Sequence, residues 1–367
     1  MRRVSLLRLI VVFVWTGLSS LGGGRSAYFH ESLVRRRGWI RHDEFVQDFT
    51  LSQVMPGPNF SNLAVVLGYR LAGFAGGVWG LLAVVLPGAL ILLAASGLYA
   101  EGAFGTGATL LMRGLSAAVV GLVAVTSLRI MCGSLRGARA AAIALLTFVA
   151  VGPLRLPHRR GGACDDRAEL RPLPLRARSA SGAAAHPAAS GERVMANLAL
   201  LTWTFLWLSF LCVGGGLGVI PEMERQAVTI HHWLTAREFV DGYTLSQLTP
   251  GPNMLVAVFV GHRVHGLLGA ALAGLAMFVP TSVLAIVISH HWQQWRDRPW
   301  AVAAERALLP VGVGLMAGGV YTLARTALHD GVTAALAVAT AIVVATDRVP
   351  PVVAILAAGA IGWLLWR

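Results

Sequence analysis

A nine-residue stretch that no helix can pass through unbroken occurs twice in this chain. The first copy reads Leu-Ser-Gln-Val-Met-Pro-Gly-Pro-Asn at 51–59, and the second reads Leu-Ser-Gln-Leu-Thr-Pro-Gly-Pro-Asn at 245–253. Proline lacks an amide N–H and its ring clashes with the preceding turn, so each copy predicts that a helix stops and restarts. Apolar sequence flanks both copies, and broken helices at membrane depth are tolerated only where the freed backbone groups face protein or a water-filled cavity. The two breaks are therefore the leading candidates for a functional site.

The composition predicts an all-α integral membrane protein that crosses a bacterial inner membrane several times. Hydrophobic residues make up 56% of the 367 residues and charged residues only 13%, whereas soluble domains carry about 25% charge. Several apolar runs approach the length of about 20 residues that a spanning helix needs. The net charge is +13, but the arginines are scattered over loops rather than gathered on one face. Nucleic acid is therefore not an expected partner.

A shift of about 193 residues aligns the first half of the chain with the second. The matches fall on residue types that chance rarely aligns: Trp15 with Trp207, Trp39 with Trp233, Gly73 with Gly266, Pro87 with Pro280, and Arg113 with Arg306. We infer an internal duplication, with a first repeat at 1–154 and a second at 194–367. Duplicated membrane proteins with broken helices are typically secondary transporters that hold substrate where the repeats meet.

The distribution of arginine predicts that the two repeats have inverted topology. The segment 25–44 holds five arginines and its counterpart 217–238 only two, while 129–139 holds three and its counterpart one. The loop near 100–107 has none, but its counterpart holds Arg296, Arg298 and Arg306. Because cytoplasmic loops carry the excess of positive charge, the reversal at each comparison indicates opposed orientations, with the N-terminus inside.

Residues 155–193 interrupt this order. The second repeat ends with an apolar arm after Pro350-Pro351, whereas the first repeat continues into an Arg/Pro/Ala-rich run and is expected to lack that arm. One interpretation is a low-complexity cytoplasmic linker. The other is a segment altered by a frameshift, which the DNA sequence would decide.

Each break predicts an anion site. Proline suits the first turn of a restarted helix, and the N–H groups of that turn lack partners and carry partial positive charge. A buried helix N-terminus is therefore suited to an oxyanion. The expected substrate-binding residues at the breaks are Ser52, Gln53, Pro56, Gly57, Pro58, Asn59, Ser246, Gln247, Pro250, Gly251, Pro252 and Asn253.

Further residues extend the predicted site. The glycine triplets Gly22, Gly23, Gly24 and Gly214, Gly215, Gly216 end the first helix of each repeat, where they serve tight packing or substrate contact. Arg70 and Arg263 either anchor the membrane edge or attract the anion. Glu31, Glu222 and Glu224 are candidates for a coupling proton if burial raises their pKa; pairing with arginine is the alternative.

No metal site, cofactor or enzyme activity is predicted. The cysteines, Cys132, Cys164 and Cys212, lack metal-ligand spacing. The histidine pairs at 231–232 and 290–291 lie beside tryptophans, as interfacial residues do. No nucleophile–base pair of a hydrolase and no nucleotide-binding fingerprint is recognisable.

In combination these motifs resemble the chromate ion transporter family, a family with a duplicated domain. The residues that carry the resemblance are Gly22-Gly23-Gly24, Arg37-Gly38-Trp39, Leu51-Ser52-Gln53 and Pro56-Gly57-Pro58-Asn59, with their second copies. The resemblance implies export of chromate from the cytoplasm, coupled to ions or protons. Sulfate or another oxyanion, or an inactive paralogue, are the alternatives. The expected partners are a small inorganic oxyanion and the lipid bilayer, and a homodimer is left open.

Overall fold

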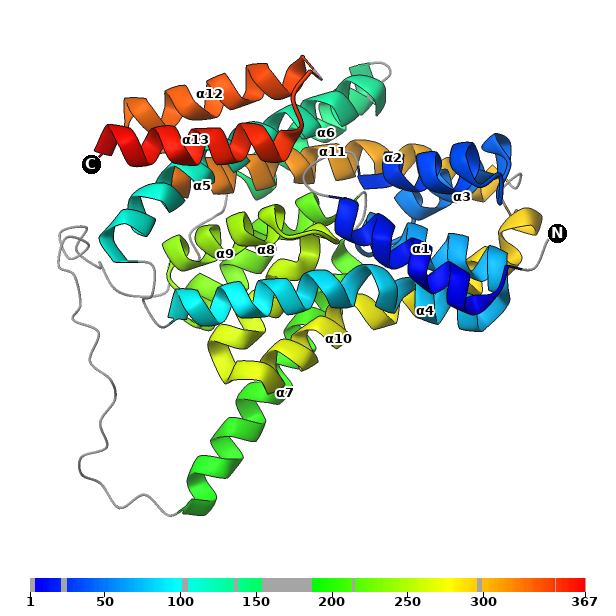
Figure 1. Ribbon diagram of the computed structural model, residues 1–367, viewed down its shortest axis with the longest axis horizontal. Helices are drawn as coiled ribbons and strands as arrows, with labels where there is room; N and C mark the ends of the chain where they lie inside the picture. Colours follow the sequence, from blue (N-terminus) through cyan, green and yellow to red (C-terminus); the bar gives the residue numbers. More distant parts are fainter. Residues whose placement is uncertain are drawn as a thin grey trace.

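The computed structural model describes residues 4–20, 25–100, 105–134, 138–153, 187–212, 215–295, 299–346 and 348–366, and this part of the chain is helical without strands. The predicted site residues Gly22, Gly23, Gly24 and Gly214 lie outside it. So do residues 154–186, which form most of the predicted linker. The all-α prediction is confirmed for the described residues (Figure 1).

The helices of the first repeat are α1 (Leu6–Ser19), α2 (Arg25–Phe29), the π-helix η1 (His30–Arg36), α3 (His42–Val54), α4 (Asn59–Ala100), α5 (Gly105–Ser134) and α6 (Ala138–Val151). Those of the second are α7 (Pro187–Leu211), η2 (Gly216–Val219), α8 (Ile220–Glu224), η3 (Arg225–Ile230), α9 (Ala236–Leu248), η4 (Asn253–Leu255), α10 (Val256–Trp295), α11 (Pro299–Ala327), α12 (Gly331–Ala345) and α13 (Pro351–Trp366). The same order recurs, as the duplication predicts. Among the described α-helices only α13 has no counterpart, and α7 begins inside the segment predicted as a linker.

Four of the described helices contain stretches long and apolar enough to cross a membrane, namely Asn59–Tyr99, Thr109–Cys132, Val194–Leu211 and Asn253–His291. Four further apolar helices, α1, α6, α12 and α13, are shorter.

Helices α4 and α10 are each folded back into a hairpin. In α4 the reversal lies at Ala72 and Gly73, and Gly73 has a φ of +68°, which a residue with a side chain rarely adopts. Beyond the turn, Gly76 lies so close to Gly68 that a Cβ there would be 2.9 Å from the Gly68 carbonyl carbon. Eight residues of straight helix span about 12 Å, so the two arms run antiparallel. Gly266 (φ +58°) reverses α10 in the same way.

The contacts between the hairpins show that the repeats are inverted. Along the second arm of α4, the Val84 carbonyl faces Gly251 and the Ser96 hydroxyl lies 2.8 Å from Nδ1 of His262. Residue numbers therefore increase in the same direction along both segments, so the second arm of α4 runs parallel to the first arm of α10. Because each hairpin reverses direction, the first arms of α4 and α10 point in opposite directions. The inverted topology predicted from arginine counts is therefore present in the fold.

The remaining helices interlock the two repeats. Helix α5 packs against α12 and α13 of the second repeat, while α11 packs against α6 of the first. Small residues permit these contacts: a Cβ on Gly121 would collide with the Ala337 carbonyl, and one on Gly314 with Ala144. Figure 1 shows α6, α12 and α13 along one side of the molecule and α1, α4, α7 and α10 along the other, with α3, α8 and α9 between them.

Candidate functional site

The first break is an extended segment between two helices. Helix α3 ends at Val54, Met55 is extended (φ −72°, ψ 145°), Gly57 has a φ of +108°, and α4 begins at Asn59. The Pro58 carbonyl accepts the Asn62 N–H at 3.0 Å, so Pro58 is the N-cap residue. The second break matches, with Gly251 at φ +116° and an extended Pro252 (ψ 147°) as N-cap. The prediction that both prolines occupy the first helical turn is wrong by one residue, because each proline precedes the helix and its asparagine is the first helical residue.

Protein groups satisfy the backbone that the first break frees. The Gly57 N–H donates to the Cys212 carbonyl at 2.8 Å, and the Asn62 side-chain amide donates to the Pro56 carbonyl at 2.9 Å. The Ser61 hydroxyl donates to the Pro58 carbonyl at 2.8 Å. The break thus meets the condition for irregular backbone at membrane depth.

Each break packs against the hairpin of the other repeat, and we call this contact the seat of the break. A Cβ on Gly57 would lie 2.6 Å from Cβ of Thr281, which follows the helix-interior Pro280 of α10. Reciprocally, a Cβ on Gly88, which follows Pro87 of α4, would collide with the Pro250 carbonyl. The two seats are related by the repeat, so the breaks are held at the same interface from opposite directions.

A cavity of about 170 Å³ lies where the two breaks meet. Its lining comes from both breaks, from the second glycine motif, and from α2, α5 and α11: Ser26, Phe49, Gln53, Pro58, Asn59, Phe60, Leu63, Thr126, Ile130, Gly215, Gly216, Leu217, Pro252, Asn253, Met254 and Met316. Since one water takes about 30 Å³ of liquid volume, the cavity is large enough for a small polyatomic ion. Of the predicted residues, the structure brings Gln53, Pro58, Asn59, Gly215, Gly216, Pro252 and Asn253 together here.

The described lining is largely apolar, and its polar groups are amides, hydroxyls and backbone dipoles rather than charged side chains. None of the described lining residues is Arg, His, Asp or Glu. The Asn59 side-chain amide contacts Oε1 of Gln53, and its own Oδ1 is buried without a hydrogen-bond partner. Asn59 also begins α4, whose first N–H groups carry partial positive charge. The cavity therefore combines a helix N-terminus with the side-chain amide of Asn59, whose oxygen atom has no hydrogen-bond partner.

The other polar residues of the repeated motif point back into the protein. The Ser52 hydroxyl donates to the Phe49 carbonyl at 2.7 Å, and the Ser246 hydroxyl donates to the Tyr243 carbonyl at 2.6 Å. Gln247 donates to the Tyr243 hydroxyl at 2.7 Å. Pro56, Gly57, Pro250 and Gly251 form the breaks without lining the cavity.

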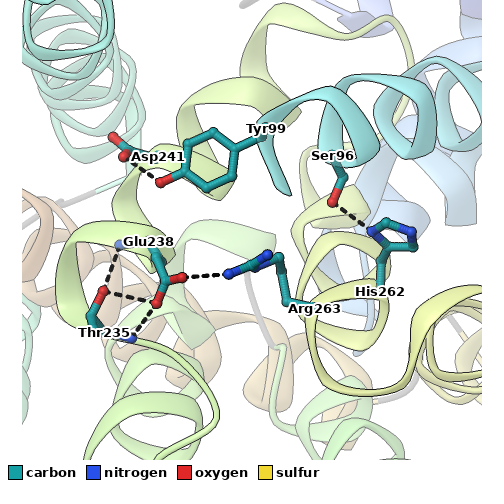
Figure 2. Close-up of polar contacts among 7 residues, drawn as sticks. All are labelled: Ser96, Tyr99, Thr235, Glu238, Asp241, His262 and Arg263. Atoms are coloured by element: carbon teal, nitrogen blue, oxygen red, sulfur yellow. Dashed lines mark hydrogen bonds and ion pairs between the residues drawn. The ribbon is translucent and has the colours of Figure 1, made fainter. Parts of the chain in front are cut away.

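The two predicted arginines bind carboxylates away from the cavity. Arg70 makes a bidentate pair with Asp48, with both nitrogen–oxygen distances at 2.5 Å. Arg263 pairs with Glu238 at 2.6 Å (Figure 2). In both repeats the arginine thus ties the first arm of the hairpin to the polar helix that precedes the break, α3 or α9.

The predicted coupling glutamates also lie outside the cavity lining. Glu31 is half-exposed and pairs with Arg35 and Arg36, at 3.7 and 3.2 Å. Glu222 makes a bidentate pair with Arg225, at 2.7 and 2.6 Å. Glu224 is buried and borders a separate cavity of about 250 Å³ that Tyr321 and Arg325 also line.

Helices α3 and α9 are equivalent in sequence but differ in packing. Val46 is 45% exposed, whereas its counterpart Val240 is 5% exposed. Thr50 is half-buried, whereas Thr244 is fully buried and contacts the Ser116 hydroxyl of α5 at 3.3 Å. Helix α9 is therefore enclosed between α4, α5 and α10, while α3 is less enclosed. The cavity has one tightly packed side and one looser side.

Several lining residues escaped the sequence reasoning. Phe49, Thr126, Met254 and Met316 line the cavity, but apolar or single hydroxyl side chains in an apolar helix carry no pattern that marks them. Asp48 and Asp241 were also missed. They fall at non-equivalent positions of the repeat, so the alignment did not highlight them.

The repeats coincide with a known domain. The family model described as "Chromate transporter" matches residues 7–158 and 199–363. The chain belongs to this family. Each match covers one repeat, so the fold is a tandem pair of the family's domain, and the chain is a multi-pass membrane protein with apolar spanning helices.

Relatives from this family are similar over most of their length. The chain is 28% identical over 348 residues to the chromate transport protein of Cupriavidus metallidurans, covering 92% of this chain and 87% of the relative. It is 29% identical over 393 residues to the chromate transport protein of Pseudomonas aeruginosa, covering 98% and 92%. A probable chromate transport protein of Synechococcus elongatus is 27% identical over 350 residues, covering 89% and 86%. No solved structure matches the chain.

Proposed function

We propose that this protein is a secondary transporter that moves chromate, or a similar tetrahedral oxyanion, across the bacterial inner membrane, in the direction of export. The observation that carries the proposal is the cavity lined by both Pro-Gly-Pro-Asn breaks. Inverted-repeat transporters hold substrate at such an interface, where half-helix N-termini point at anionic groups. The names of the bacterial relatives support chromate as the substrate.

The chemistry of the cavity suits an oxyanion that must also leave. Backbone N–H groups at the start of α4 and the amides of Gln53, Asn59 and Asn253 offer hydrogen bonds to oxygen atoms. A charged arginine in the cavity would hold a dianion more tightly, but transport requires that the ion be released. Chromate and sulfate have the same shape and charge, so sulfate is the second candidate. We propose binding and release, with no bond made or broken in the ion.

The packing difference between α3 and α9 supports alternating access. In a pair of inverted repeats, the opposite end state is obtained when the two repeats exchange conformations. Helix α3 would then be enclosed against α11, as α9 is enclosed against α5, and α9 would loosen. The cavity would open to the other side of the membrane while the ion stayed between the same two breaks.

The test is ion flux through the purified protein in liposomes. We expect uptake of radiolabelled chromate into vesicles that contain the protein, with inhibition by excess unlabelled chromate. Asn59→Asp places a negative charge in the cavity and should abolish uptake. Ser5→Asp is the control, because it adds the same charge at the exposed N-cap of α1, where Asp is as favourable as Ser. Absence of chromate and sulfate flux in the folded wild-type protein would overturn the proposal.

A further inference from the structure

Asp241 is a buried carboxylate that the proposed transport site does not use. It lies in the middle of α9 and is 6% exposed. Tyr99, near the end of the α4 hairpin, points its hydroxyl at this carboxylate and donates to Oδ2 at 2.9 Å (Figure 2). The Ser116 hydroxyl of α5 also interacts with it. Asp241 therefore lies where α9 is enclosed between α4 and α5.

Asp241 differs from the other buried aspartate in its partners. Asp48 on α3 is neutralised by the bidentate Arg70. Within the described part of the chain, no arginine or histidine nitrogen lies within ion-pair distance of Asp241. An isolated ionised carboxylate is costly to bury, whereas a protonated one is not.

The partners of Asp241 are suited to both protonation states. A hydroxyl group donates to a carboxylate and accepts from a carboxylic acid, so Tyr99 can reverse its hydrogen bond when a proton arrives. An arginine cannot do this, because it only donates. Asp48 beside Arg70 is therefore fixed as an anion, while the surroundings of Asp241 allow a change of charge.

Several charged side chains that are themselves partly exposed lie near Asp241. Arg263 of α10 lies over the Tyr99 ring, with its guanidinium carbon 6.0 Å from the ring centre, and pairs with Glu238 one turn before Asp241 (Figure 2). Arg237 acts on Asp241 at longer range. Among the described residues, five groups face this carboxylate or influence its charge. They are Tyr99 on α4, Ser116 on α5, Arg263 on α10, and Arg237 and Glu238 on α9 itself.

We propose that Asp241 is the proton-binding site that couples proton movement to transport, an inference that rests on the proposed transport function. The Asp241 carboxylate takes one proton from water on the side to which α9 loosens. As a neutral acid it is enclosed between Tyr99 and Ser116, and it returns the proton to water on the opposite side of the membrane, to which the cavity is open while α9 is enclosed. No bond other than O–H is made or broken.

The position of Asp241 on α9 explains how its protonation state affects the anion site. The same helix continues through Ser246 and Gln247 to the second break, which lines the cavity with Pro252 and Asn253. Protonation favours enclosed α9 because it removes the cost of burying the charge. The helix that places one half of the cavity lining therefore responds to a proton. Glu31 and Glu222 are less suited, since each is paired with an arginine that fixes it as an anion.

The test compares Asp241→Asn with Glu222→Gln in liposomes that contain a pH-sensitive dye. In the wild-type protein, chromate flux should be accompanied by a proton flux, and net transport should change by up to about tenfold per pH unit, as expected when one proton is linked. Asp241→Asn should lose the proton flux and the pH dependence but retain exchange of external for internal chromate. Glu222→Gln should behave like the wild type.

Three outcomes would overturn the inference or its basis, and they are distinguishable. Proton flux of wild-type size in Asp241→Asn would remove Asp241 from this role. Wild-type chromate flux without any proton flux would overturn the coupling but leave the proposed transport function standing. No oxyanion flux at all would remove both.

A second variant and a binding measurement test the proposal even if Asp241→Asn misfolds. Tyr99→Phe removes only the hydroxyl that faces Asp241 and should shift the pH at which transport is half-maximal; an unchanged midpoint would contradict the proposal. In detergent, chromate binding should change the number of bound protons in the wild type and not in Asp241→Asn, as read from binding heats in buffers of different ionisation enthalpy.

Discussion

The amide N–H of Gly57 donates a hydrogen bond of 2.8 Å to the carbonyl oxygen of Cys212. Gly57 is the centre of the break in the first repeat, and Cys212 follows the end of α7 in the second. A single backbone bond therefore joins the first break to the start of the second glycine motif. Since Gly215 and Gly216 of that motif line the cavity, this bond fixes two parts of the lining relative to one another.

The first prediction concerns Gly57→Ala. A Cβ there meets Thr281, with their Cβ atoms 2.6 Å apart, and the backbone is left-handed. A left-handed alanine costs about 1–2 kcal/mol, and overpacking about 1–3 kcal/mol more. Gly38→Ala is the control, because Gly38 is also left-handed (φ +58°) but has open space around it. Thermal unfolding in detergent should show the larger loss for Gly57→Ala; equal losses would contradict the seat on Thr281.

The second prediction tests the reciprocal seat on α4. Gly88→Ala brings a methyl group into the Pro250 carbonyl and within 2.8 Å of the Leu255 side chain, so it should displace the second break and reduce transport sharply. Gly97→Ala, in the same helix, meets nothing within 4 Å. It should preserve transport and stabilise the helix by up to about 1 kcal/mol, since Ala is the better helix former. Full transport by Gly88→Ala would show that the breaks need not be held rigidly.

The sequence predicted the larger part of this fold because its strongest signals are local. Proline removes a backbone donor wherever it occurs, so the breaks at Pro56 and Pro250 could be located without tertiary information. Repetition then showed that the two breaks are equivalent, and arginine counts predicted their opposite orientation. The hairpin turns at Gly73 and Gly266 were aligned as a repeated pair, but their reversal was not predicted. It depends on the sign of φ, which sequence alone leaves open.

The partners of charged side chains were harder to predict than the breaks. Arg70 and Arg263 were expected either to anchor the membrane edge or to attract the anion, yet each pairs with a carboxylate, Asp48 or Glu238, 22 or 25 positions earlier. Such pairing depends on how the helix before the break lies against the hairpin after it. Neither periodicity nor spacing specifies that angle. Asp241 was overlooked for the same reason, because what distinguishes it is that no arginine or histidine among the described residues forms an ion pair with it.

The third prediction concerns the buried ion pair of the first repeat. The Asp48 side chain is 4% exposed and Arg70 is 18% exposed. Arg70→Gln leaves the carboxylate buried without its cation and should destabilise the protein by about 3–5 kcal/mol. Arg263→Gln should cost less, since its partner Glu238 is 27% exposed and water can take over part of the solvation. Unfolding midpoints in detergent measure both losses.

A double variant separates this explanation from a role in anion binding. Asp48→Asn combined with Arg70→Gln removes both charges and should recover much of the stability that Arg70→Gln loses. Chromate affinity per folded molecule should be unchanged in Arg70→Gln and in the double variant, because neither Asp48 nor Arg70 lines the cavity. A large loss of affinity in Arg70→Gln, with stability restored in the double variant, would place Arg70 in the anion site after all.

The last prediction concerns the unequal packing of α3 and α9, and it uses the equivalent residues Val46 and Val240. In a background with the three native cysteines replaced, Val46→Cys should react with a hydrophilic maleimide at least about tenfold faster than Val240→Cys, because reaction at a buried site requires local opening. If the two helices exchange their packing during transport, chromate should change the two rates in opposite directions. The pair is its own control, since the residues occupy the same position of the repeat and differ only in exposure. Equal rates in the absence of chromate would contradict the asymmetry of this conformation. Unequal rates that chromate leaves unchanged would contradict alternating access between the two breaks.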